Sequence, residues 1–214
     1  FHKRKPLRSL KLSAALRLME KKGGVVGWQE EIEMTDKIFV PFQKIPRLSR
    51  DMIITEKIDG TNSCICITED GEFLTASRKR WITPEDDNYG FSRWAHEHKE
   101  ELMMLGTGFH YGEWWGSGIQ RGYGLKEKRF SLFNTSRWSD PSVRPACCHV
   151  VPILYTGMFD TQVIMQVMDR LLEHGSYAAE GYMRPEGVVI FHTASGHLYK
   201  KTFEKDDSGK GDGS

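Results

Sequence analysis

The chain has 214 residues, of which 39% are hydrophobic and 28% are charged, and its formal net charge is +1. This length suits one ordinary domain, and enough residues are hydrophobic to fill a core, which excludes wholesale disorder. No apolar run approaches the roughly 18 residues of a membrane span, which excludes an integral membrane protein. Four cysteines are too few for a disulfide scaffold, which favours a reducing compartment and a cytoplasmic location.

The first 22 residues hold most of the charge asymmetry. They contain eight lysines and arginines and one acid, so they carry +7 and the remaining 192 residues carry −6. Their leucines follow helical spacing, so a basic amphipathic helix is one interpretation. A solvated extension, a contact with nucleic acid phosphates or an anionic surface, and an organellar targeting peptide are the open alternatives. The Gly-Gly pair at positions 23 and 24 ends this pattern, so we expect residues 1–24 to form a disordered basic arm.

From Val25 onward the chain alternates short strands with two helices. The predicted strands are Ile53–Glu56, Cys64–Thr68, Glu72–Ser77, Phe109–Trp115, Phe130–Phe133, His149–Leu154, Val188–His192 and His197–Phe203. The predicted helices are Tyr89–Met104 and Asp160–His174. This order predicts an α+β fold with a largely antiparallel sheet. Residues 206–214 consist of Gly, Asp, Lys and Ser, which predicts a disordered tail.

Three local signals support these elements. Asp70-Gly71 is a hairpin-turn pair between two of the strands. Asp160 is placed to cap the second helix, and Gly175 follows its last turn. The apolar stripe of that helix comprises Val163, Ile164, Val167, Met168, Leu171 and Leu172.

The segment Thr55–Asn62 is the most informative of the chain. It reads Thr-Glu-Lys-Ile-Asp-Gly-Thr-Asn and places Lys57 between two strands. A polar turn is one interpretation, and Lys-x-Asp-Gly alone should arise by chance in roughly one chain in twenty. The other interpretation is covalent nucleotidyl transfer, in which a neutral lysine amine attacks a phosphorus atom. Such a site also needs cations near the phosphates, an aromatic face for the base and a carboxylate for Mg²⁺.

Residues of each required type follow later in the chain. They are the cation Arg78, the acid Glu113 within Tyr111–Gly116, the aromatic residues of Phe130–Phe133, the acid Glu186 before an apolar strand, and Lys200-Lys201. Each has an ordinary structural explanation by itself: a solvated charge, a turn acid, a core residue or a guard on an edge strand. Their joint order is what favours a common site.

These segments together resemble the covalent nucleotidyltransferases, which include polynucleotide ligases and messenger RNA capping enzymes. The closest likeness is to the RNA ligase 2-like group found in bacteriophages and elsewhere. The resemblance covers residues 25–205 and implies a ligase adenylation domain with two largely antiparallel sheets and flanking helices. The six matching segments are Glu56–Asn62, Ser77-Arg78, Tyr111–Trp114, Phe130–Asn134, Glu186–Val189 and Tyr199–Thr202.

The resemblance also implies a role for each site residue. Lys57 would form the lysyl-AMP phosphoramidate, Glu186 would hold the metal, and Lys200 would contact the α-phosphate. Glu113 would bind the ribose hydroxyls and Phe133 would stack on adenine, with Phe130 as the alternative. The other residues expected to bind the nucleotide or an RNA end are Glu56, Asp59, Asn62, Arg78 and Lys201. Asn62 favours the RNA ligases, because DNA ligases and capping enzymes usually place Arg there.

The expected function is an ATP-dependent RNA ligase that joins 5′-phosphate and 3′-hydroxyl ends in RNA repair. It would use ATP and Mg²⁺, or Mn²⁺, and act on nicked duplexes or single-stranded ends in the cytoplasm, that of the host if phage-encoded. Three departures from the family keep alternatives open. Thr202 stands where many relatives have a second lysine, Asn134 stands where many have Asp, and nothing after Lys205 could form an RNA-binding domain. The alternatives are a DNA ligase, a stand-alone adenylyltransferase, a catalytically impaired nucleotide- or RNA-binding module, or a ligase whose protein partner supplies RNA binding.

Overall fold

The computed structural model describes residues 41–204. Contacts along the chain divide it into two units, Phe1–Ile45 and Pro46–Ser214, and all the strands and helices described below belong to the second. The expected basic arm, the expected domain start at Val25 and the expected tail 206–214 lie outside the described residues. Within the described part, no helix is both long and apolar enough to cross a membrane.

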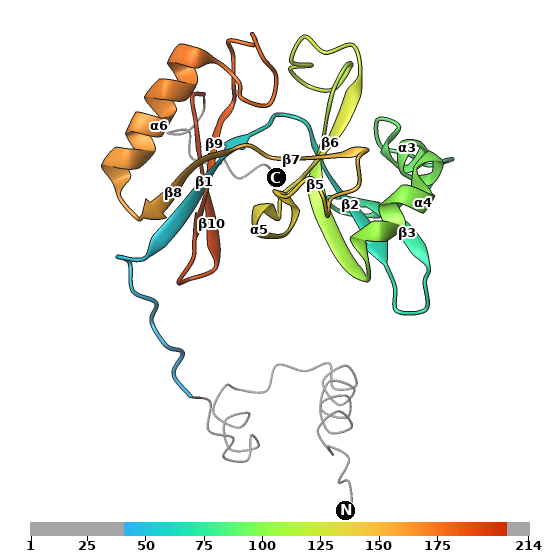
Figure 1. Cartoon of the computed structure of the whole chain (residues 1–214), viewed down its shortest axis with the longest axis horizontal. Coiled ribbons are helices and arrows are strands. Elements are labelled where there is room, and N and C mark those ends of the chain that lie inside the picture. The colour runs from blue at the N-terminus through green and yellow to red at the C-terminus, as the bar shows by residue number, and fades with distance from the viewer. Residues whose placement is uncertain (1–40, 205–214) are drawn as a thin grey trace, which may run out of the picture. The chain divides into compact units, whose positions relative to one another are not determined.

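The first sheet is four-stranded and antiparallel, in the order β10-β9-β1-β8. Its strands are β1 (Asp51–Lys57), β8 (Ile153–Met158), β9 (Gly187–His192) and β10 (His197–Thr202). Helix α6 (Thr161–His174) covers one face (Figure 1). Its buried side chains Val167, Met168 and Leu171 pack against Met52, Ile54, Val188 and Ile190 of that face. On the opposite face, which we call the open face, residues of β1 and β9 alternate as half-buried positions.

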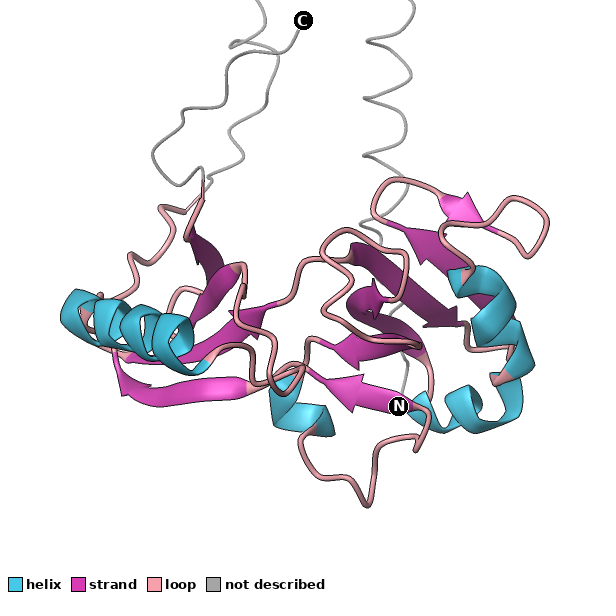
Figure 2. Cartoon of the chain, turned by 90° about the horizontal axis from the view of Figure 1, so that it is seen from above, coloured by secondary structure: helices cyan, strands magenta, loops and turns pink. Residues whose placement is uncertain are grey.

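The second sheet is six-stranded, in the order β4-β3-β2-β5-β6-β7. Its strands are β2 (Thr61–Ile67), β3 (Phe73–Ser77), β4 (Trp81–Ile82), β5 (Gly108–Gly116), β6 (Lys128–Leu132) and β7 (Cys148–Val150). The β6–β7 pair is parallel and the other pairs are antiparallel. Helices α3 (Phe91–Glu97) and α4 (Lys99–Leu102), with the 3₁₀ turn η1 (Met103–Leu105), pack on one face (Figure 2). The short helix α5 (Thr135–Trp138) follows β6.

The structure confirms the predicted α+β fold with two largely antiparallel sheets and flanking helices. It also confirms the expected caps of α6. The Asp160 carboxylate accepts a hydrogen bond of 2.7 Å from the backbone N–H of Gln162, and Gly175 ends the helix with φ +80°. The apolar stripe is wrong at one position, because Leu172 is 57% exposed and only its neighbour Leu171 reaches the core.

Two predicted elements are divided in the structure. The helix expected over Tyr89–Met104 starts at Phe91 and breaks at His98, whose backbone (φ −104°, ψ 16°) leaves the helical region between α3 and α4. The strand expected over His149–Leu154 becomes β7 and β8, which belong to different sheets. Pro152 lies between them, and it has no N–H to donate to a strand partner. One predicted strand therefore carries the chain from one sheet to the other.

Candidate active site

Lys57 and Glu186 meet at the end of the four-stranded sheet. Lys57 is the last residue of β1, and its Cα lies opposite that of Gly187, the first residue of β9. Glu186 directly precedes β9, and its Oε2 lies 2.7 Å from the Lys57 Nζ. Both side chains keep partial exposure, at 24% and 18%. The structure thus brings together two residues 129 positions apart, in an ion pair that a ligand can still reach.

Glu113 lies on β5 of the six-stranded sheet, beside the turn that follows Lys57. Its Oε1 accepts a hydrogen bond of 3.1 Å from the backbone N–H of Gly60. A Cβ at Gly60 would meet the Trp114 carbonyl oxygen at 2.5 Å and the Trp115 Cβ at 2.6 Å, so only glycine fits here. This close approach explains why the Lys-x-Asp-Gly turn ends in glycine, and it keeps Glu113 next to the turn that follows Lys57.

The environment of Glu113 favours its protonated form. Burial raises the pKa of Glu113 from its ordinary value of 4.5 to about 7, and the negative charges of Glu186 and Asp59 act in the same direction. The Lys57 ammonium and the Gly60 N–H oppose this rise. A carboxyl whose pKa is raised this far by burial and neighbouring charges is a candidate functional group.

The strand β10 places its two lysines on opposite faces of the four-stranded sheet. Lys200 lies opposite Val189, which in turn lies opposite Thr55, so Lys200 shares the open face with Thr55 and Lys57. Lys201 lies opposite Val188 on the face that α6 covers. The register therefore brings Lys200 to the face of the nucleophile candidate and does not bring Lys201 there.

Thr202 also belongs to the open face. Its Cα lies opposite that of Gly187 on β9, and Gly187 in turn lies opposite Lys57 on β1. The Thr202 hydroxyl donates a hydrogen bond of 2.7 Å to the Glu204 carbonyl. Gly187 has φ +149°, and a Cβ there would collide with the Lys201 carbonyl oxygen. This glycine therefore allows β10 to approach β9 directly beside Glu186.

The side chain of Glu56 is directed away from the site. It is 1% exposed and accepts hydrogen bonds from the Ser176 hydroxyl (2.5 Å) and the N–H groups of Tyr177 (2.8 Å) and Ala178 (2.9 Å). Burial raises the pKa of this carboxyl, and the three donors oppose that rise. The sequence places Glu56 among the nucleotide-binding residues, whereas its carboxylate anchors the loop after α6 to the strand that ends in Lys57.

Asp59 belongs to a cluster that the sequence analysis missed. Its carboxylate forms an ion pair with Arg121 (2.9 Å), and its N–H donates to the Tyr123 hydroxyl (2.8 Å). Arg121 also lies 3.4 Å from a Glu204 carboxylate oxygen and donates to the Arg184 carbonyl. The one available signal was the glycine-rich run from position 116 to 124, which contains both Arg121 and Tyr123.

An open pocket of about 460 Å³ lies at this cluster. The residues that line it are Asp59, Gln120, Arg121, Glu186, Thr202 and Glu204. Arg121 thus connects the turn after Lys57, the segment before Glu186 and the segment after β10 around one opening.

The two phenylalanines expected to stack on a base have different environments. Phe130 is fully buried between Phe91 and Trp94, so it is part of the core. Phe133 is 39% exposed, and its N–H donates a 3.0 Å hydrogen bond to the Tyr111 carbonyl. Of the two, only Phe133 offers a ring face to a ligand. Asn134 caps α5 by accepting from the Arg137 N–H (3.2 Å), a role that Asp serves equally well.

Asn62 and Arg78 belong to the same end of the six-stranded sheet as Glu113. The Cα of Asn62 lies opposite that of Glu113, so the two share one face of β2 and β5. Arg78 lies in the exposed turn between β3 and β4, next to Ser77, whose Cα lies opposite that of Ser63. The structure therefore places Asn62 beside Glu113 and Arg78 at the same end of the sheet.

The carboxylates suit a divalent cation that is shared with a substrate. Within residues 41–204, no group of three or more His, Cys, Asp or Glu could enclose a metal ion. Mg²⁺ commonly binds through one or two carboxylates together with phosphate oxygens and water. Glu186, partly exposed at the pocket, provides such a ligand, so the donor set fits a cation that arrives with a nucleotide.

Comparisons with known proteins identify the family of the chain. The sequence model of the RNA ligase family matches residues 50–203. Three similar solved structures are variants of an RNA ligase from Naegleria gruberi: one with AMP and manganese (19% identity, TM-score 0.53), one without ligand (20%, 0.53) and one with ATP and manganese (18%, 0.52). Each match covers 72% of this chain. No curated protein sequence matches the chain.

At this identity the solved structures establish the fold alone. The chain spans about half the length of those proteins, since each alignment covers 49% or 50% of them.

Proposed function

Because the chain belongs to the RNA ligase family, we propose that it is an ATP-dependent RNA ligase with Lys57 as its nucleophile. The single observation that carries this proposal is the 2.7 Å contact between Lys57 and Glu186, at the meeting point of β1 and β9. It supports the proposal because a nucleophilic lysine and a metal-binding carboxylate must meet in such an enzyme. The solved relatives with ATP or AMP and manganese support the choice of nucleotide and of a divalent cation.

In the proposed first step, the neutral amine of Lys57 attacks the α-phosphorus of ATP. An N–P bond forms, the P–O bond to pyrophosphate breaks, and the amine loses a proton. Lys200 lies on the same sheet face as Lys57, so its ammonium can stabilise the charge that develops on the α-phosphate. A divalent cation held by Glu186 would supply positive charge that stabilises the pyrophosphate and disfavours the ammonium form of the lysine.

The six-stranded sheet would position the nucleoside part of ATP. Glu113 is partly buried and lies within hydrogen-bond distance of the Gly60 N–H, where its carboxylate can accept hydrogen bonds from ribose hydroxyls. The partly exposed ring of Phe133 offers a stacking face for adenine. Such positioning supplies much of the rate enhancement in phosphoryl and nucleotidyl transfer.

Two further transfers would complete the reaction. An oxygen of an RNA 5′-phosphate attacks the lysine-bound phosphorus, the N–P bond breaks, and AMP passes to the RNA end. A 3′-hydroxyl then attacks the 5′-phosphorus, and AMP leaves as the new phosphodiester forms. Asn62 and Arg78, at one end of the six-stranded sheet, are the residues we assign to these RNA phosphates.

A stand-alone adenylyltransferase is the second candidate. The residues assigned to the first step, Lys57, Glu186 and Lys200, belong to the four-stranded sheet, whereas Asn62 and Arg78, assigned to the RNA phosphates, belong to the other sheet, so the first step can stand without the later ones. Under this alternative Lys57 is adenylylated as before, but strands are not joined.

The test is incubation with Mg²⁺ and α-labelled ATP, followed by a denaturing gel and by a ligation assay on nicked and single-stranded RNA and on DNA. We expect label on the parent protein and a loss of at least about 1,000-fold in Lys57→Ala. Lys99→Ala is the matched control, an exposed lysine on α4. Absence of label on the parent protein would contradict the enzyme proposal, and label without RNA joining would favour the adenylyltransferase.

A further inference from the structure

Three large aromatic side chains lie exposed on one face of the six-stranded sheet. Trp81, Phe109 and Tyr111 are 53%, 58% and 52% exposed. Their rings form a continuous row, with centroid distances of 6.4 Å between Trp81 and Phe109 and 6.1 Å between Phe109 and Tyr111. The last two rings are inclined by only 12°. We call these three residues the aromatic face.

The strand register explains why these rings gather. Tyr111 lies opposite Cys64, Cys64 lies opposite Ala76, and Ala76 lies opposite Trp81, so one row crosses four strands. The two middle residues are small, which leaves the rings of the flanking residues raised above them. The other side of the same sheet buries Trp114 and Phe130 against α3. The core is therefore complete without the aromatic face, and its exposure calls for another explanation.

The aromatic face is continuous with the proposed nucleotide site. The hydrogen bond from the Phe133 N–H to the Tyr111 carbonyl extends the β5–β6 pairing by one residue. Glu113 follows Tyr111 by two positions on β5 and therefore lies on the same sheet face. An RNA end held at Asn62, whose Cα lies opposite that of Glu113, can therefore extend over the aromatic face.

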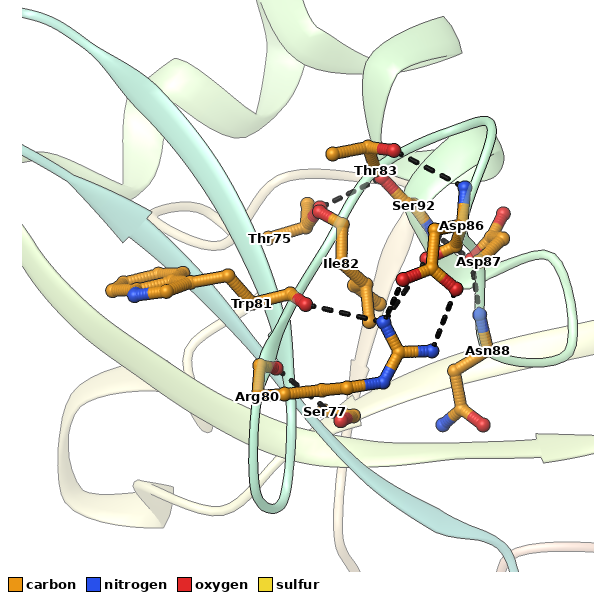
Figure 3. Close-up of polar contacts among 10 residues, drawn as sticks. All are labelled: Thr75, Ser77, Arg80, Trp81, Ile82, Thr83, Asp86, Asp87, Asn88 and Ser92. Atoms are coloured by element: carbon orange, nitrogen blue, oxygen red, sulfur yellow. Dashed lines mark hydrogen bonds and ion pairs between the residues drawn. The ribbon is translucent and has the colours of Figure 1, made fainter.

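Cations flank the aromatic face at its turn between β3 and β4. Arg80 is held by Asp86, with hydrogen bonds of 2.5 and 3.0 Å, and its carbonyl accepts from the Ser77 N–H at 2.9 Å. Figure 3 shows the Trp81 ring pointing away from this ion pair. Arg78 and Lys79 are exposed in the same turn, and within residues 41–204 no carboxylate lies within ion-pair distance of either. The turn therefore presents positive charge next to the rings.

We propose that the aromatic face binds unpaired nucleotides of an RNA end, an inference that rests on the proposed ligase function. Bases would stack on Trp81, Phe109 and Tyr111, and Arg78 and Lys79 would contact the phosphates. Flat aromatic rings beside cations are the recurrent features of single-strand binding surfaces, since every base offers a π-face. The bases of RNA would stack on the rings and its phosphates would pair with the cations, whereas an apolar protein partner would contact only the rings.

The test measures the affinity of the full chain for a fluorescein-labelled single-stranded RNA of about 12 nucleotides by anisotropy. We expect Trp81→Ala and Tyr111→Ala each to raise the Kd by about 5-fold to 100-fold. Trp81→Phe and Tyr111→Phe keep a stacking face and should stay within about twofold of the parent protein. The matched control is Leu172→Ala, which removes an equally exposed apolar side chain from α6 and should leave the Kd unchanged.

The salt dependence tests the cations separately. Replacing Arg78 and Lys79 together by Gln should reduce the slope of log Kd against log salt by about 1.4, because each phosphate that is no longer neutralised lowers it by about 0.7. An unchanged slope would contradict their assignment to phosphates.

Two outcomes would overturn the aromatic-face proposal itself. One is an unchanged Kd in both alanine variants. The other is a dimer in the parent protein that Trp81→Ala converts to a monomer while RNA affinity stays the same, which would make this face a protein interface. RNA binding is measured without ATP, so its loss in these variants stands even if the parent protein fails to form lysyl-AMP. Label on Lys57 with RNA affinity unchanged by the aromatic variants would instead remove this inference and keep the ligase.

Discussion

The two sheets of the molecule carry different parts of the proposed chemistry. The four-stranded sheet contributes charge: Lys57 and Lys200 lie on its open face, and Glu186, which pairs with Lys57, lines the pocket. The six-stranded sheet contributes shape and hydrogen bonding: Glu113, Phe133 and the aromatic face lie along β5 and its neighbours. Covalent transfer needs a few strong charges at fixed positions, whereas recognition of a nucleotide and an RNA end needs a broader surface. The difference predicts that substitutions in the two sheets have separable effects.

Glu186→Gln should have the largest effect among the site variants that keep the nucleophile. It removes the charge that pairs with Lys57 and that would hold the cation, so we expect adenylylation to slow by about 1,000-fold, or about 4 kcal/mol. RNA affinity should stay within about twofold of that of the parent protein, because the substitution leaves the six-stranded sheet and its aromatic face unchanged. Single-turnover labelling and the anisotropy assay measure the two effects. Glu85→Gln, an exposed acid outside the pocket, is the control and should keep the rate of the parent protein. A parallel loss of RNA binding in Glu186→Gln would break the division between the sheets.

Glu56→Ala should destabilise the fold by about 3 to 4 kcal/mol, because it leaves the N–H groups of Tyr177 and Ala178 and the Ser176 hydroxyl without their buried acceptor. Urea denaturation of the purified variant measures this loss. Glu180→Ala replaces an exposed acid of the same loop and should change stability by less than about 0.5 kcal/mol. A loss below about 1 kcal/mol in Glu56→Ala would show that this carboxylate is not a structural anchor and would return it to the nucleotide-binding set.

Glu113→Gln should change the pH dependence of stability. Burial raises the pKa of Glu113 from 4.5 to about 7, so between these pH values the folded protein keeps a proton that the unfolded chain has released. The free energy of unfolding of the parent protein therefore falls as pH rises through this window. Glutamine does not titrate, so the free energy of unfolding of the variant should exceed that of the parent protein by about 3 kcal/mol at pH 8 and equal it near pH 4.5. Chemical denaturation at both values checks this, and a pH-independent difference would contradict the raised pKa.

Thr202→Lys should produce the smallest effect. It places a second cation on the open face, two positions from Lys200. We expect KM for ATP in the adenylylation step to fall about three- to fivefold, or about 1 kcal/mol, since the site is partly exposed. Leu198→Lys adds the same charge on the same face further from Lys57 and should leave KM unchanged. A rise in KM would indicate that Thr202 itself serves the site.

Sequence reasoning succeeded where the signal is local. The α6 helix follows from its apolar spacing and its caps Asp160 and Gly175, and the turn at Gly71 (φ +85°) follows from Asp70-Gly71. Lys57, Glu186 and Glu113 are predicted as site residues because their segments resemble known motifs, and in the structure they lie close together. Their meeting, by contrast, depends on strand register, which only the structure provides.

The failures share one physical cause, which is dependence on partners distant in sequence. Glu56 looks like a site residue because it precedes Lys57, yet its carboxylate oxygens are satisfied by a loop 120 to 122 residues later. The glycine-rich run around Arg121 does not indicate what the side chain contacts, since its ion-pair partner Asp59 lies 62 residues before it. The break at His98 interrupts a segment whose composition suits one continuous helix.

The most direct test of the account is to locate AMP on the protein after incubation with ATP and Mg²⁺. Peptide mapping by tandem mass spectrometry identifies the modified side chain, and acid lability with resistance to alkali identifies the N–P bond. The account predicts a single AMP on Lys57, which is discharged when 5′-phosphorylated RNA is added. AMP on any other residue, or no covalent AMP at all, would contradict the assignment of the covalent chemistry to the four-stranded sheet.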